Sequence, residues 1–125
     1  MATIRRFEDI GAWQKARKLT FSVYKLTREG EFSRDFGLRD QIRRASVSIM
    51  ANIAEGFGRR TDRDFAHFLT ISRSSAAEVQ SHLYVASDLN YISGNDFQLL
   101  YDELEQLSKM IFSLTNHLRK STEKR

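Results

Sequence analysis

The chain has 125 residues, enough for one domain with a hydrophobic core, and its 41% of hydrophobic residues excludes disorder over most of its length. It lacks cysteine, which excludes disulfides, thiolate metal sites and cysteine nucleophiles, and it lacks proline, which favours helices over a turn-rich β fold. The formal net charge is +4, and residues 1–28 alone carry seven basic and two acidic side chains, which indicates an anionic partner for this part. No apolar run is long enough to cross a membrane and no signal peptide is recognisable, so we expect a cytoplasmic protein.

The first predicted helix covers residues 9–28 and has one apolar and one basic face. Its apolar positions recur at helical spacing and are Trp13, Ala16, Leu19, Val23 and Leu26. Four basic residues fall within an arc of about 100° on another face, and they are Arg17, Lys18, Lys25 and Arg28. Phe21 lies in the middle of this arc, where an aromatic ring can stack on an unpaired base while the basic groups bind phosphates. A solvated charged face, with Phe21 buried in a subunit contact, is the alternative.

The second predicted helix covers residues 35–58 and is apolar on two sides. Its core positions are Leu38, Ile42, Ala45, Ile49, Ile53 and Gly56. A second apolar side favours self-association and consists of Val47, Met50, Ala54 and Phe57. The alternative is that a neighbouring helix wraps further around this side. We interpret Asn52 and Glu55 as structural, because a buried asparagine often fixes register or oligomeric state.

Two further helices are predicted over residues 62–90 and 95–120, and the last five residues, STEKR, are expected to fray. Gly30 with the polar stretch EFSRD, the segment GFGRRT and the segment SGN separate the four helices. Thr61 and Asp64 have the spacing of a capping box for the third helix. Since such short connections force neighbouring helices to run antiparallel, residues 1–125 are predicted to form a single all-α domain, an antiparallel up-down-up-down four-helix bundle.

The sequence offers no recognisable catalytic or metal chemistry. His67, His82 and His117 are scattered and form no pair at metal-ligand spacing, so neither a metal nor a cofactor is expected. No serine has a histidine and an acid placed to activate it, which argues against an enzyme. Gly56-Phe57-Gly58 is interpreted as a turn that ends the second helix.

Several stretches together resemble a known bacterial family, the four-helix-bundle proteins encoded within intervening sequences of 23S ribosomal RNA genes. They are Trp13-Gln14-Lys15-Ala16, Tyr24-Lys25-Leu26-Thr27, Gly37-Leu38, Gln41-Ile42-Arg43-Arg44-Ala45, Ser48-Ile49 and Asn52-Ile53-Ala54-Glu55-Gly56, followed by the Ser74 to Glu78 region. The resemblance implies a small cytoplasmic bundle that assembles as a ring, typically a homopentamer, without known enzymatic activity. It also implies similarity in fold to the basic, pentameric accessory protein of diversity-generating retroelements, which is thought to engage nucleic acid and a reverse transcriptase. The chain departs from the family pattern at Met50, where relatives usually carry proline, and at Ser33, where they often do.

The leading hypothesis is therefore a homo-oligomeric RNA-binding protein. Its predicted phosphate contacts are Arg17, Lys18, Lys25, Arg28, Arg43 and Arg44. The alternative is a protein–protein adaptor that serves an enzyme encoded nearby and makes no direct contact with nucleic acid.

Overall fold

The apolar periodicity of the chain forms four long helices in the computed structural model, which describes residues 4–123. They are α1 (Gly11–Thr27), α2 (Phe36–Phe57), α3 (Asp62–Asp88) and α4 (Gly94–Glu123). Two short 3-10 helices precede α1 and α2, namely η1 (Phe7–Asp9) and η2 (Gly30–Arg34). No strand occurs in the described part of the chain, so the prediction of an all-helical protein with four helices is confirmed.

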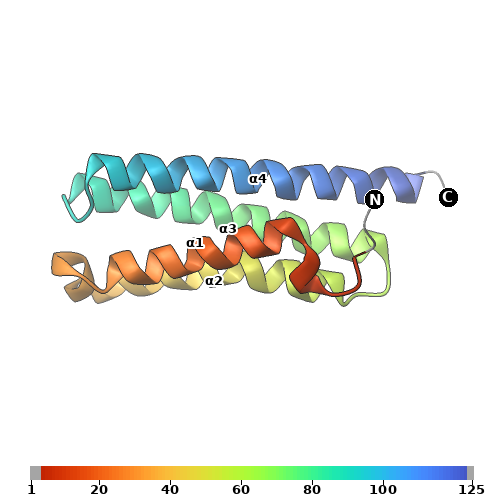
Figure 1. Ribbon diagram of the computed structural model, residues 1–125, viewed down its shortest axis with the longest axis horizontal. Helices are drawn as coiled ribbons and strands as arrows, with labels where there is room; N and C mark the ends of the chain where they lie inside the picture. The colour runs from red at the N-terminus through yellow and green to blue at the C-terminus, as the bar shows by residue number, and fades with distance from the viewer. Residues whose placement is uncertain (1–3, 124–125) are drawn as a thin grey trace.

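The four helices lie side by side along the long axis of the molecule, and the chain reverses direction at each connection (Figure 1). The α2/α3 and α3/α4 pairs pack most extensively, α1 packs mainly on α2, and α1 touches α4 over a smaller area. Among the described helices none is long and apolar enough to cross a membrane.

The helix ends follow from local residue chemistry. Asp35 caps α2 by accepting the Leu38 N–H at 3.1 Å, and Thr61 caps α3 by accepting the Asp64 N–H at 3.1 Å. At the end of α3, Asn90 adopts φ 58° while the Tyr91 N–H donates to the Ala86 carbonyl at 2.9 Å, the arrangement of a Schellman motif. Of these ends, the sequence predicted the Thr61 cap, whereas α3 stops at Asp88, two residues before its predicted end.

The observed helices differ from the predicted ranges by one to three residues at seven of their eight ends. The first helix begins two residues late because Ile10 is extended and separates it from η1. The second continues through Gly56 and Phe57, so the glycine-rich turn begins only at the Gly58 cap. The fourth reaches Glu123, so the prediction that the last five residues fray is wrong for residues 121–123. Lys124 and Arg125 lie outside the described residues.

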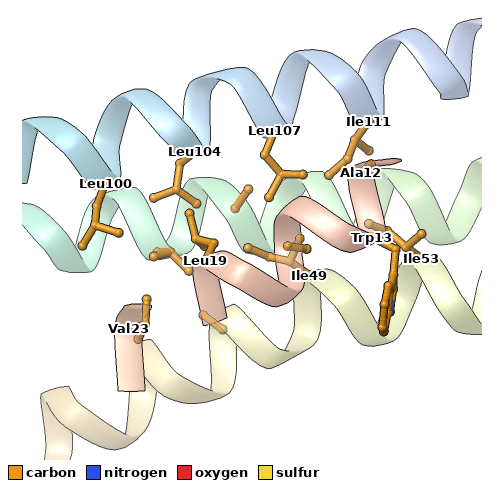
Figure 2. Close-up of a cluster of buried hydrophobic side chains, with 14 of the residues drawn as sticks. Ala12, Trp13, Leu19, Val23, Ile49, Ile53, Leu100, Leu104, Leu107 and Ile111 are labelled. Atoms are coloured by element: carbon orange, nitrogen blue, oxygen red, sulfur yellow. The ribbon is translucent and has the colours of Figure 1, made fainter. Parts of the chain in front are cut away.

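The core lies where the helical stripes predicted it, and side chains of α1, α2 and α4 meet there (Figure 2). Small residues let α2 approach α3 closely: Ser72 donates to the Ile49 carbonyl at 2.7 Å, and Gly56 faces Phe65 and Phe68. Glycine is needed at position 56 of α2 because the close approach of α3 leaves no room for a side chain.

The connection between α1 and α2 is not the polar linker that its sequence indicated. Gly30 adopts φ 59° and starts η2, which places Phe32 fully inside the core. The Phe32 ring packs against Tyr91 at 5.3 Å between centroids, and the Tyr91 hydroxyl donates to Asp35 at 3.0 Å. This segment therefore closes one end of the bundle.

Candidate functional site

The basic face of α1 carries exposed cations that form no close ion pair within residues 4–123. Arg17, Lys18, Lys25 and Arg28 are all exposed. The ion pairs formed within residues 4–123 involve other arginines: Arg6 with Glu8, Arg39 with Asp40, and Arg59 with Glu55. The positive potential of this face is consequently not cancelled by close ion pairing.

A recess of about 640 Å³ opens on this face, bordered by η1 and the first three turns of α1. Two rows of side chains at i, i+4 spacing form most of it. One row is Trp13, Arg17 and Phe21, and the other is Gln14, Lys18 and Ser22, with Glu8 completing the lining. Phe21 is 66% exposed, so its ring presents an apolar surface beside two cations.

Several contacts hold together the end of this recess that lies next to η1. Phe7 packs edge-on against Trp13 with 5.1 Å between ring centroids, and the Arg17 guanidinium lies 5.8 Å from the Trp13 ring. Gln14 donates to the Glu8 carbonyl at 2.8 Å, which ties η1 to α1. Because the Glu8 carboxylate already pairs with Arg6, it offsets little of the charge of Arg17 and Lys18.

Lys25 lies further along α1, in a neighbouring recess of about 320 Å³ between α1 and α4. Three carboxylates share its lining, those of Glu29, Asp96 and Glu103. The charge of Lys25 is therefore balanced locally, and it is a weaker candidate for a phosphate contact than Lys18.

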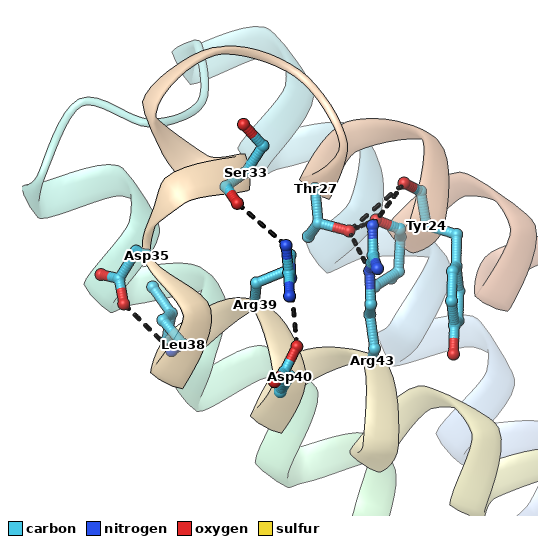
Figure 3. Close-up of polar contacts among 9 residues, drawn as sticks. Tyr24, Thr27, Ser33, Asp35, Leu38, Arg39, Asp40 and Arg43 are labelled. Carbon is cyan, nitrogen blue, oxygen red and sulfur yellow. Dashed lines mark hydrogen bonds and ion pairs between the residues drawn. The ribbon is translucent and has the colours of Figure 1, made fainter.

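Arg43 forms a latch between α2 and α1 (Figure 3). Its Nε donates to the Thr27 hydroxyl at 2.7 Å, Nη2 donates to the Tyr24 carbonyl at 3.5 Å, and the guanidinium lies 4.6 Å from the Tyr24 ring centroid. Arg43 is half-buried and two of its donor groups are already used. Its first role is thus to hold the two helices together.

Arg44 lies on yet another side, in a polar recess of about 400 Å³ between α2 and α3. Gln41, Glu78 and His82 share this recess with it. The structure therefore gathers Arg17 and Lys18 with Phe21, places Lys25 in the neighbouring recess beside α4, and places Arg43 and Arg44 on other surfaces.

The predicted oligomer interface divides into exposed and half-buried residues. Phe21 and Val47 are exposed, and the exposed fraction of Val47 is 40%. Met50, Ala54 and Phe57 are half-buried because they pack against the core of their own chain. The second apolar side of α2 thus exposes less apolar surface than its sequence indicated.

The two residues interpreted as structural make local contacts. Asn52 donates to the Ser48 carbonyl at 2.8 Å and to its hydroxyl at 3.0 Å, and that hydroxyl meets the Ser75 hydroxyl of α3 at 2.9 Å. This chain of hydrogen bonds fixes α2 against α3. Glu55 is exposed and pairs with Arg59 at 3.0 Å on the helix surface.

The described residues offer little further chemistry from metal-binding or titratable groups. Within residues 4–123, histidine and acidic side chains do not gather in groups of three that could hold a metal ion. The pKa of Tyr91 is raised because its hydroxyl donates to the Asp35 carboxylate, with burial and the charges of Asp35 and Glu31 adding to the effect.

Trp13, Gln14 and Glu8 are lining residues that the sequence did not single out. The periodicity assigned Trp13 to the core, and it is indeed only 9% exposed, yet it also borders the recess. The signal that could have found the site is the i, i+4 row from Trp13 through Arg17 to Phe21.

Comparison with known proteins identifies the chain's relatives. Residues 8–113 match the model of a family described as the 23S rRNA-intervening sequence protein. No curated protein matches the chain. A crystal structure from Bacteroides thetaiotaomicron VPI-5482, described as a protein with unknown function from the S23 ribosomal protein family, has a TM-score of 0.76. It is 22% identical to this chain and covers 83% of this chain and 97% of its own, a similarity that concerns the fold.

Proposed function

The chain belongs to the 23S rRNA-intervening sequence protein family, and from its α1 surface we propose that this antiparallel bundle is a non-enzymatic, homo-oligomeric RNA-binding protein. The family name gives no activity, and the similar crystal structure is described as one of unknown function. The proposal consequently rests on this chain's own residues.

The observation that carries the proposal is the group of exposed cations on α1, Arg17, Lys18 and Arg28, which form no close ion pair within residues 4–123. Arg17 and Lys18 flank the exposed Phe21, and Arg28 extends the basic surface to the end of the helix. Phosphate oxygens are the natural partners of such cations, because binding releases counterions from the nucleic acid. RNA is favoured over duplex DNA because the aromatic ring can also contact an unpaired base.

Self-association strengthens the argument from charge. Exposed Val47 on α2 supports a subunit contact, as do Tyr84 and Leu89 near the end of α3, which are 52% and 48% exposed. A ring of five copies, each with a net charge of +4, would carry about +20 and attract a polyanion strongly at moderate salt. Light scattering of the purified protein measures the number of copies directly.

The test is a salt-dependent RNA titration of the wild-type protein and of the double variant Lys18→Glu/Arg28→Glu. We expect the wild-type log–log salt slope to equal several phosphate contacts, at about 0.7–0.9 per contact, and the variant to lose most of its affinity. The matched control is Lys109→Glu/Arg119→Glu, which reverses the same number of exposed charges on α4. Equal affinity of the two double variants would refute the α1 face as the binding surface.

A protein–protein adaptor is the alternative outcome of that titration. Absence of RNA binding even at low salt would favour it, and the exposed apolar residues on α2 and α3 would then be the surface to map.

A further inference from the structure

The recess on α1 combines features that fit one nucleotide better than a uniform polyanion. Phosphate recognition alone needs only exposed cations, whereas this site adds a hollow of about 640 Å³ lined by the rings of Trp13 and Phe21. That volume lies within the range of roughly 300–1,000 Å³ that is usual for small-ligand pockets. From these features, and resting on the RNA-binding function proposed above, we infer that the recess holds one unpaired base stacked on Phe21, so that the protein selects single-stranded over duplex RNA.

The aromatic wall supplies the stacking surface. Phe21 leaves 66% of its surface uncovered, and a flat ring exposed to this extent can take a base of any sequence on its face. Trp13 at the other end is held in place by Phe7 and Arg17, so the hollow is preformed and need not be assembled upon binding.

The polar groups around the wall supply contacts for the sugar, the phosphate and the base edge. Arg17 and Lys18 stand beside Phe21 and carry the positive charge that a phosphate needs. Gln14 and Ser22 line the same hollow and can hydrogen-bond to a base edge or a ribose hydroxyl. Bases in a duplex are paired and stacked, so only an unpaired base can enter.

A second copy of this chain is a poorer occupant of the same hollow. Covering the recess with protein would remove Arg17 and Lys18 from water, which is costly unless the partner supplies acidic groups at that point. A nucleotide brings an anionic phosphate and a flat base together and thereby matches both parts of the recess.

The chain contains a built-in reporter for this inference, because Trp13 is its only tryptophan and lines the recess. We would titrate the full chain with an oligouridine strand of about 12 nucleotides and with a blunt RNA duplex that has the same number of phosphates. The expected result is a change in Trp13 fluorescence and tighter binding with the single strand than with the duplex.

Variants at Phe21 then separate stacking from charge. Phe21→Ala should weaken single-strand binding by about 5- to 150-fold, the loss of one base–aromatic stack, and leave duplex binding and oligomeric mass unchanged. Phe21→Tyr should retain single-strand binding, because a tyrosine ring also stacks. The matched control is Phe36→Ala, which removes a ring that is 63% exposed and lies beside Arg39, at 4.7 Å from its guanidinium.

The outcomes distinguish failure of the inference from failure of the function. Salt-dependent RNA binding without single-strand preference, or with equal loss for Phe21→Ala and Phe36→Ala, overturns the base recess and leaves RNA binding intact. A change of oligomeric mass in Phe21→Ala also overturns it, since Phe21 would then be a subunit contact. No binding of either RNA at low salt refutes both proposals.

Discussion

Gly56 offers a sharp test of how closely α2 and α3 approach each other, because the substitution Gly56→Ala adds a single methyl group to their interface. A Cβ atom at this position would lie 2.7 Å from the Phe68 Cβ, 2.9 Å from the Phe65 Cδ1 and 3.3 Å from the Phe65 carbonyl oxygen. The Phe68 Cβ and the Phe65 carbonyl are fixed by the backbone of α3, so rotating a side chain cannot relieve these contacts. The two helices would have to move apart.

Two effects of opposite sign determine the size of the change in stability. Replacing glycine by alanine inside a helix is worth about 1 kcal/mol in favour of folding. Overpacking a well-packed interface costs about 1–3 kcal/mol, and contacts with immovable backbone lie at the upper end of that range. We therefore expect Gly56→Ala to lower the free energy of unfolding by about 2 kcal/mol.

Urea denaturation followed by circular dichroism, at one fixed protein concentration, measures this change. The matched control is Gly37→Ala in the same helix, where the new Cβ would be 3.8 Å from the Asp35 Oδ1 and meet no clash. This control should gain about 0.4–1 kcal/mol by reducing the entropy of the unfolded chain. If Gly56→Ala were stabilised as much as the control, the close helix approach that the argument relies on would be wrong.

Three further predictions concern contacts made by η2, by α2 and by the connection between α3 and α4. Phe32→Ala should destabilise the protein by about 3–5 kcal/mol in urea denaturation, since this ring is fully buried; a loss below about 1 kcal/mol would mean that the segment is a true linker. Arg43→Ala should cost about 1–2 kcal/mol of stability because the hydrogen bond to Thr27 is lost, and it should change RNA affinity less than charge reversal at the α1 face. A larger effect on RNA titration than on unfolding would contradict the role of Arg43 as a latch between α1 and α2. Tyr91→Phe should be less stable than wild type below pH 10, with the difference closing as pH rises further. Hydrogen bonding to Asp35 raises the pKa of Tyr91 above its unfolded value of about 10, so this stabilisation is lost as pH rises through the raised pKa. Denaturation of both proteins at several pH values measures the difference in stability. A difference that does not vary with pH would contradict the prediction.

The candidate site illustrates how helical rotation limits interpretation of a charge pattern. Arg43 and Arg44 are neighbours in sequence, yet one contacts α1 and the other borders the α2/α3 recess. Consecutive helical residues differ by about 100° in direction, so adjacency in sequence alone does not place two basic residues on one surface. Of the six predicted phosphate contacts, Arg17 and Lys18 are the pair that the fold brings together with an exposed aromatic ring.

The sequence by itself determined the four helices, the capping residue Thr61, and most of the core. These features depend on short-range rules: apolar spacing along one helix, and hydrogen bonds between residues three positions apart. The basic face of α1 is of the same kind, because residues on one helix share a face whatever surrounds it.

Only the tertiary structure decided what each face meets. It buried Phe32 against Tyr91, used Arg43 to join two helices, covered part of the second apolar side of α2, and placed η1 beside Trp13 to form the recess. Each of these contacts joins segments whose relative rotation and separation are set by packing the whole bundle. Periodicity within one segment carries no information about that rotation, so the sequence could not predict a recess that η1 and α1 form together.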